Sequence, residues 1–129
     1  MKSDLYRTID ANYNRYQEGI RVAEDLLRYE LNSPLSKRLK TLRHIRLPNY
    51  KEVIRHRDVK GDILKTTVKS EKVRENLEDI IIANLKRAQQ SARVLEECYK
   101  IYDLHTSELF KNARYALYEI EKDILISND

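Results

Sequence analysis

Two stretches of this sequence carry the same polar residues at the same spacing, and their side chains are of the kinds that bind anions. The shared pattern, A-N-x-x-R-x-Q-x-x-x-R-V-x-E-[DE], begins at Ala11 and returns 72 positions later at Ala83. Arginine side chains bind phosphate through bidentate, charge-assisted hydrogen bonds. The repeated polar residues are Asn12, Arg15, Gln17, Arg21 and Glu24 in the first stretch and Asn84, Arg87, Gln89, Arg93 and Glu96 in the second.

Three interpretations of the repeat are open. Exposed helix pairs, such as Arg15 with Glu18 and Arg21 with Glu24 or Asp25, stabilise a helix by only a few tenths of a kcal/mol, which places little constraint on residue identity. A buried hydrogen-bond network, in which Asn12 and Asn84 tie helix turns to neighbouring backbone, explains the repeat better. So does a ligand cleft lined by both copies, with Arg15 and Arg87 as anion receptors. The residues alone do not decide between the last two.

A second group of cationic side chains lies near carboxylates. Arg43 and His44 end a predicted helix, and the segment 55–62 reads R-H-R-D-V-K-G-D, which includes Arg57, Asp58 and Asp62. A phosphate accompanied by a divalent cation needs this combination, with arginines on the phosphoryl oxygens and Asp58 or Asp62 on the metal. The alternative is a solvated basic loop in which Asp58 pairs with Arg57 or caps a turn.

Several other kinds of site are excluded or disfavoured. Phosphate loops and dinucleotide-binding loops need several glycines, and the sequence has only Gly19 and Gly61. The three histidines show no metal-ligand spacing with Cys98, which argues against a zinc site. Cys98 is the only cysteine, so an intrachain disulfide is impossible.

Composition indicates long amphipathic helices that must position these residues. Of 129 residues, 41% are hydrophobic, 36% are charged, and only two each are Gly and Pro, which argues against a turn-rich β-fold and against disorder. Apolar residues recur in steps of three and four, as on one face of a helix. The three stripes are Ile9, Tyr13, Tyr16, Ile20, Ala23 and Leu27; Ile81, Leu85, Ala88, Ala92, Leu95 and Tyr99; and Phe110, Ala113, Leu117, Ile120 and Ile124.

Capping residues and prolines set the expected helix boundaries. Ser3 and Asp4 can cap the first helix, Ser70 begins a later one, and Thr106 or Ser107 caps the last. Gly61 is expected to give the loop between the two halves its conformational freedom. The predicted helices are about 4–31, 34–46, 50–57, 70–103 and 106–126, with a loop at 58–62.

The repeat predicts an all-α bundle built from two copies of a helix pair. A second similarity, shifted by 71 positions, relates the segment beginning at Leu39 to the one beginning at Phe110. We therefore expect a single domain, 1–129, with repeat one at 4–47, a connecting segment at 48–70 and repeat two at 71–126. The two copies are expected to be related by a pseudo-twofold axis, because neither pair can bury its apolar face alone.

Charge and hydropathy indicate the expected compartment and the expected classes of binding partner. No apolar run approaches the length needed to span a membrane, so a reducing cytosol is the expected compartment. The net charge of +4 is weak evidence for nucleic acid as a partner. The basic strip from Lys37 to Arg46 alternates with leucines, as in any amphipathic helix with a solvated face. Nucleic-acid binding is therefore not predicted.

Motifs along nearly the whole chain resemble those of the small helical domain often found N-terminal to thiamine-phosphate synthase. That domain is described as an alternative hydroxymethylpyrimidine-phosphate kinase family. The motifs are D-A-N-x-N-R-x-x-E-G-I-R-V-x-E-D from Asp10, L-K-x-L-R-H from Leu39, Arg57-Asp58 with Gly61-Asp62, A-N-x-x-R-A-Q from Ala83, R-V-L-E-E from Arg93 and R-Y-x-L-Y-x-x-E from Arg114.

The resemblance implies transfer of the γ-phosphoryl group of ATP to hydroxymethylpyrimidine phosphate, with Mg²⁺, to give the diphosphate used in thiamine assembly. It also implies a role for each matched side chain. These roles are substrate-phosphate binding by Arg15 and Arg87, nucleotide-phosphate binding by Arg43 and His44, transition-state stabilisation by Arg57, Mg²⁺ binding by Asp58 and Asp62, pyrimidine recognition or helix fixing by Asn12 and Asn84, and orientation of the attacking hydroxyl by Glu18 or Glu24. Arg21 and Arg93 complete the expected phosphate-binding set.

Two departures from the family pattern affect these expectations. The family is usually joined to a barrel synthase that these 129 residues lack, so we expect no synthase activity in them. Gln90 stands where the second copy is expected to have Glu, which assigns any acid–base role to Glu18. The alternative function is a non-catalytic helical module that dimerises or docks onto thiamine-phosphate synthase.

Overall fold

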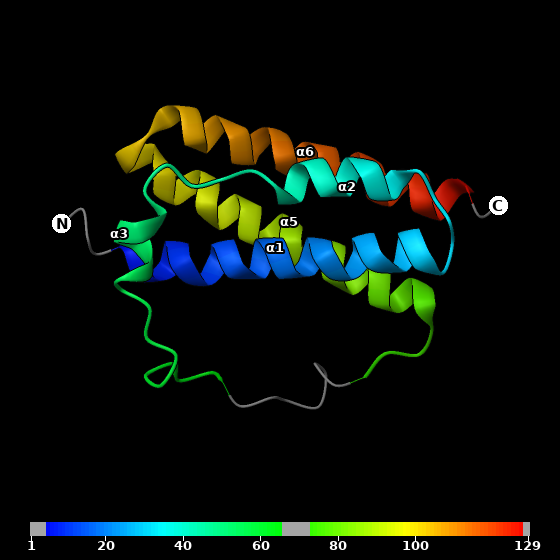
Figure 1. The fold of residues 1–129 in the computed structure, drawn as a ribbon, viewed down its shortest axis with the longest axis horizontal. Coiled ribbons are helices and arrows are strands. Elements are labelled where there is room, and N and C mark those ends of the chain that lie inside the picture. Colours follow the sequence, from blue (N-terminus) through cyan, green and yellow to red (C-terminus); the bar gives the residue numbers. More distant parts are fainter. Residues whose placement is uncertain (1–4, 66–72, 128–129) are drawn as a thin grey trace.

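The computed structural model describes residues 5–65 and 73–127, and every regular element in these ranges is a helix (Figure 1). The predicted all-α bundle is thereby confirmed. The helices are α1 (Tyr6–Tyr29), α2 (Leu35–Arg43), α3 (Tyr50–Ile54), α5 (Leu77–Tyr102) and α6 (Leu104–Ser127).

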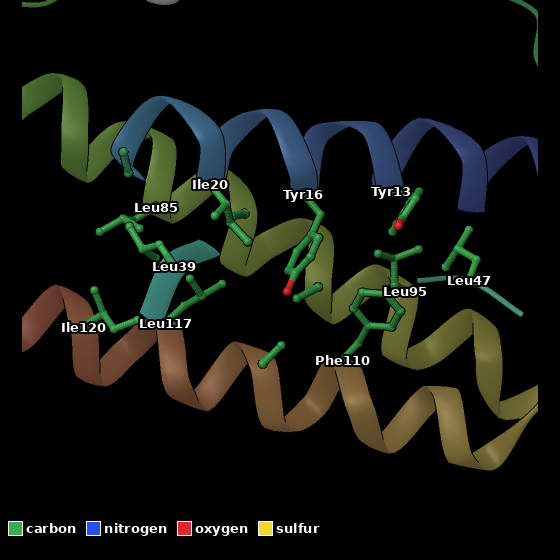
Figure 2. Close-up of a cluster of buried hydrophobic side chains, with 14 of the residues drawn as sticks. Tyr13, Tyr16, Ile20, Leu39, Leu47, Leu85, Leu95, Phe110, Leu117 and Ile120 are labelled. Carbon is green, nitrogen blue, oxygen red and sulfur yellow. The ribbon is translucent and has the colours of Figure 1, made fainter. Parts of the chain in front are cut away.

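The bundle is organised around α1 and α5, which pack against each other and run in opposite directions (Figure 1). Helix α2 folds back on α1, and α6 folds back on α5, so each half is an antiparallel helix pair, as the repeat predicts. The short helix α3 lies against the beginning of α1. All residues of the three apolar stripes are buried, and Tyr16, Leu95 and Phe110 lie together between α1, α5 and α6 (Figure 2).

The two long helices approach each other closely at Gly19. A Cβ atom at Gly19 would lie 2.7 Å from the backbone oxygen of Asn84 and 3.5 Å from Cβ of Ala88. Glycine is therefore needed here because of close helix packing, at a residue inside the repeated motif.

Several helix boundaries differ from the expected ones. Helix α3 ends at Ile54 instead of Arg57, and α6 begins at Leu104 instead of 106. Helix α2 ends at Arg43 instead of Arg46. Pro48 has no N–H to continue the helix, and the carbonyls of Leu42 and Ile45 instead accept hydrogen bonds from Tyr16 and Tyr13, both at 2.7 Å.

Helix α5 begins at Leu77 because Asn76 caps it, accepting a hydrogen bond from the Asp79 N–H at 2.8 Å. The expected start at Ser70 lies outside the described residues, as do Ser3 and Asp4. The last helix is preceded by Asp103, whose carboxylate accepts from Thr106 at 2.6 Å. Thr106 and Ser107 are themselves buried inside α6.

The loop predicted at 58–62 is present, but the reason for its glycine is different from the expected one. No glycine among the described residues has positive φ. A side chain at Gly61 would instead collide with the carboxylate of Asp58, whose Oδ1 accepts the Gly61 N–H at 2.8 Å. Gly61 thus makes room for a turn closed by Asp58.

Candidate functional site

A cavity of about 360 Å³ lies between the first half of α1 and the segment that follows α3. It brings together five of the residues singled out in the sequence: Asn12, Arg15, Arg57, Asp58 and Asp62. The remaining lining residues are Arg7, Thr8, Asp10, Ala11, Asn14 and Val59.

One wall of the cavity is fixed by an ion pair between Arg57 and Asp10. Arg57 donates from Nε and Nη2 to the two carboxylate oxygens of Asp10 at 2.7 and 2.8 Å, and the Asp10 residue is 3% exposed. Nη2 also lies 3.3 Å from the hydroxyl of Tyr50 and 3.5 Å from Oδ1 of Asn14. The hydrogen bonds with Asp10 and Tyr50 raise the pKa of Arg57 above its ordinary value. The Arg57 guanidinium is therefore already hydrogen-bonded to Asp10, Tyr50 and Asn14.

Two other arginines line the cavity without a carboxylate partner among the described residues. Arg7 donates from Nη2 to the backbone oxygen of Asp58 at 3.1 Å. Arg15 has no hydrogen bond or ion pair to any part of the chain that the structure describes. Both side chains are exposed, so their N–H groups are available to an anion.

The two acidic residues of the loop each use one oxygen to close a turn. Oδ1 of Asp58 accepts from the Gly61 N–H at 2.8 Å, and Oδ1 of Asp62 accepts from the Leu64 N–H at 2.9 Å. Within residues 5–65 and 73–127 there is no cluster of three or more histidine, cysteine or acidic side chains suited to a metal. Asp58 and Asp62 thus offer at most two carboxylates to a cation.

Comparison with known proteins identifies the chain. The ThiD2 family model matches residues 7–123, which include the entire cavity. The chain belongs to the ThiD2 family.

Curated proteins that the chain resembles include several named thiamine-phosphate synthase. The protein of Prochlorococcus marinus (strain AS9601) is 34% identical over 124 residues, covering 94% of this chain and 35% of that protein. The protein of Rhodopirellula baltica is 36% identical over 127 residues, covering 93% of this chain and 34% of that protein. The ThiD2-family chain thus spans about a third of the length of these relatives, and it is associated with thiamine biosynthesis. No solved structure matches it.

In this ThiD2-family chain, Glu24 and Arg43 lie outside the cavity and bind each other. Arg43 donates from Nε to Oε1 of Glu24 at 2.6 Å and from Nη2 to Oε2 at 3.3 Å. The hydrogen bond with Glu24 raises the pKa of Arg43. The second half repeats the contact, because Arg114 donates from Nη2 to Oε1 of Glu96 at 2.9 Å.

The paired asparagines also make equivalent contacts. Asn12 donates from Nδ2 to the backbone oxygen of Thr8 at 2.9 Å, and Asn84 donates to that of Ile80 at 2.8 Å. Each bond is to the preceding turn of the same helix, whereas we expected bonds to neighbouring backbone. Within the described residues, the side-chain oxygens of both amides accept no hydrogen bond.

The other predicted site residues do not line the cavity. Arg21 pairs with Asp25, and Arg93 pairs with Glu96 and Glu97. Glu18, His44 and Arg87 are exposed, and the structure gives their side chains no partner among the described residues. Arg87 adjoins Ala88, where α5 meets Gly19, and Arg15 lies one turn before that glycine, so the two arginines come from neighbouring turns of crossing helices.

Arg7, Asp10 and Asn14 are cavity residues for which the sequence predicted no role, although Asp10 and Asn14 belong to the family motif that begins at Asp10. Arg7 and Asp10 precede the repeated motif, and Asn14 stands at one of its variable positions. A usable signal was the spacing of Arg7, Ala11 and Arg15, which are four residues apart and share one face of a helix.

The described helices also bear on membrane association. None of them is both long and apolar enough to cross a bilayer.

Proposed function

We propose that this ThiD2-family chain transfers the γ-phosphoryl group of ATP to hydroxymethylpyrimidine phosphate, with Mg²⁺, and forms the diphosphate for thiamine biosynthesis. The observation that carries the proposal is the convergence of Asn12, Arg15, Arg57, Asp58 and Asp62 on one cavity. Family membership and relatives named thiamine-phosphate synthase support the pathway.

The substrate phosphate is assigned to Arg15. Its guanidinium is exposed at the cavity and has no carboxylate partner in the described part of the chain, so it retains its full capacity for a bidentate bond to phosphate. Arg87, from the neighbouring turn of α5, is the proposed second contact. Two such donors offset the charge that accumulates when two anionic substrates are brought together.

The pyrimidine is assigned to the amide side chains. Because Nδ2 of Asn12 is used by the Thr8 carbonyl, Asn12 presents its side-chain oxygen, which accepts a hydrogen bond from an exocyclic amino group. Asn14 lines the same cavity one helical turn from Asp10. An aminopyrimidine edge carries both donors and acceptors and therefore suits a pair of amides.

Asp58 and Asp62 fit a Mg²⁺ ion that is bound by only a few protein ligands. Mg²⁺ is commonly held by one or two carboxylates and completes its shell with water and substrate phosphate. Asp58 and Asp62 each keep one carboxylate oxygen free of the turn that the other oxygen closes. When bound there, the ion would neutralise negative charge on the phosphates.

The remaining assignments change in the light of the contacts. Glu24 and Arg43 satisfy each other between α1 and α2, and we assign them a structural role. Glu18 is then the carboxylate that we propose to orient the attacking hydroxyl, because it is exposed one turn beyond Arg15 on α1. His44 remains the candidate for the nucleotide phosphates, and Arg21 and Arg93 remain candidates for phosphate binding.

The test is a direct assay of turnover. Purified protein is incubated with ATP, Mg²⁺ and hydroxymethylpyrimidine phosphate, and the diphosphate and ADP are measured by mass spectrometry. Arg15→Gln should abolish turnover while its circular dichroism stays that of the wild type. Arg38→Gln, an exposed arginine paired with Asp123 on another face, is the matched control and should retain activity. Wild-type protein that forms no diphosphate would overturn the proposal.

A docking module is the second candidate function. Ile63 and Leu64 are 92% and 80% exposed in the segment that continues from the cavity loop, and the relatives are about three times as long as this chain. A second copy or thiamine-phosphate synthase would cover these side chains. Sedimentation of the protein alone and with purified synthase tests this function, with the Ile63→Ser/Leu64→Ser protein expected to lose any association.

A further inference from the structure

The guanidinium of Arg57 is poorly placed to bind a ligand. It makes two short hydrogen bonds to a buried carboxylate, and the nitrogen Nη2 also contacts Tyr50 and Asn14. Releasing it to bind an anion would leave Asp10, which is 3% exposed, as a buried charge without its partner. Such a loss is costly. The ion pair joins residues 47 positions apart and so attaches the segment after α3 to α1.

Arg7 is placed differently. It lies eight residues before Arg15, which is about 12 Å along a helix axis and close to two full turns. The two side chains therefore extend from the same face of α1, and both line the cavity. Between them stands Ala11, whose methyl group leaves space for a ligand. Only one nitrogen of Arg7 is engaged, by the Asp58 carbonyl, and the other N–H groups have no partner among residues that the structure describes.

We propose that Arg7 is a second anion-binding residue of this cavity, acting with Arg15 across Ala11, and that Arg57 is a positioning residue, locked to Asp10, that holds the cavity loop against α1. The ligand class is a phosphate or diphosphate group. The inference deepens the proposed function and rests on it for the identity of the natural ligand, but the anion site is testable without turnover.

The second half of the chain offers an internal comparison. Asp79 stands 72 positions after Arg7, where the repeat would need an arginine, although Ala83 and Arg87 match Ala11 and Arg15. Asp79 instead contributes its N–H to the cap made by Asn76. The pair of arginines on either side of an alanine is therefore present in the first half alone, where α1 and the loop after α3 line the cavity.

The first experiment measures binding of inorganic pyrophosphate to the full chain by isothermal titration calorimetry. Arg7→Gln and Arg15→Gln should each weaken binding about tenfold, the scale of one charge-assisted hydrogen bond. Arg38→Gln is the matched exposed-arginine control and should bind as the wild type does. Binding that is unchanged in Arg7→Gln, or no binding by the wild type, would overturn the anion site.

The second experiment separates a positioning role of Arg57 from direct binding. If Arg57 positions the loop, Asp10→Asn and Arg57→Gln should weaken pyrophosphate binding equally, and the double variant should be no weaker than either. The Gly61 N–H donates a hydrogen bond to Asp58, and its hydrogen exchange should accelerate in both variants. If Arg57 binds the anion itself, Arg57→Gln should weaken binding far more than Asp10→Asn, and that result would contradict the inference.

Tyr50→Phe provides a milder version should Asp10→Asn fail to fold. It removes the hydroxyl 3.3 Å from Arg57 without leaving a buried charge, and it should cause a smaller loss in the same direction, with faster exchange at Gly61. Unaltered binding and exchange would count against a positioning role of Arg57.

A wild type that binds pyrophosphate through Arg7 and Arg15 but forms no diphosphate would refute the kinase proposal alone. Turnover with unchanged binding in Arg7→Gln would refute this inference alone.

Discussion

Glu24 on α1 and Arg43 at the end of α2 form a bidentate ion pair, with N···O distances of 2.6 and 3.3 Å. Glu96 on α5 and Arg114 on α6 form the corresponding pair in the second half, at 2.9 Å. The glutamates are 72 positions apart and the arginines 71, so the contact belongs to the repeat. In each half it joins the two helices of a pair.

Replacement of Glu24 by glutamine should destabilise the fold more than it affects any ligand. The Glu24 side chain is 6% exposed, and its loss leaves Arg43 without a counter-charge, which costs about 3 kcal/mol for a largely buried pair. Urea unfolding measures this change. Arg38→Gln breaks an exposed pair and should cost less than about 1 kcal/mol. A Glu24→Gln protein of normal stability but without turnover would restore Glu24 to the catalytic residues.

Gly19→Ala should also destabilise the protein, although alanine favours helices. Alanine gains about 1 kcal/mol over glycine in a helix interior. The added Cβ, however, would lie 2.7 Å from the Asn84 backbone oxygen, which cannot rotate away. Separating α1 from α5 costs about 1–3 kcal/mol, so we expect a net loss. The measurement is a urea titration beside Gln90→Ala, an exposed position on α5. Greater stability in Gly19→Ala would show that the helices separate easily.

Stability should fall in alkali because of buried tyrosines. Burial raises the pKa of Tyr13, Tyr16 and Tyr99 above the ordinary value of 10.0. Above pH 10 the unfolded chain loses these protons while the folded chain keeps them, so their stabilisation is complete below that pH and lost as pH rises toward the folded-state pKa. For Tyr16 the loss is about 1 kcal/mol for the first unit.

Urea unfolding at about pH 8 and about pH 11 measures this loss. Tyr16→Phe should reduce the dependence on pH while losing the hydrogen bond to the Leu42 carbonyl, worth about 1 kcal/mol. Equal pH dependence in wild type and Tyr16→Phe would mean that Tyr16 ionises with ordinary ease in the folded protein.

The helix faces were predictable from sequence because burial of an apolar stripe follows from its spacing alone. The exposed pair of Arg21 with Asp25 was also predictable, because it follows from local helix spacing, whereas the partners of Glu24 and Glu96 were not. The repeat indicates that Glu24 and Glu96 have equivalent roles. Their partners Arg43 and Arg114, however, lie on the other helix of each pair, and these arginines are related by a shift of 71 positions instead of 72. Neither arginine is close in sequence to its glutamate.

The sequence likewise did not show which residues would meet at the cavity. Arg15, Asp58 and Asp62 were identified one by one, yet they meet because Arg57 reaches Asp10 across 47 positions and Arg7 reaches the Asp58 carbonyl across 51. Tertiary contacts of this kind leave no periodic signal in the chain. Arg7 was missed because it precedes the motif that drew attention to its neighbours.

The Mg²⁺ assignment predicts a specific defect in Asp58→Asn and Asp62→Asn. An asparagine oxygen can still accept the Gly61 or Leu64 N–H, so each turn is retained while the negative charge is removed. The Mg²⁺ concentration that gives half-maximal turnover should then rise about tenfold, with partial recovery at high Mg²⁺. Asp123→Asn, which removes an exposed carboxylate on α6, is the matched control. If both loop variants keep the Mg²⁺ dependence of the wild type, these carboxylates serve only the turns and the cation is held elsewhere. Pyrophosphate binding without Mg²⁺ should be unimpaired in both variants, because the arginines that contact it are unaltered.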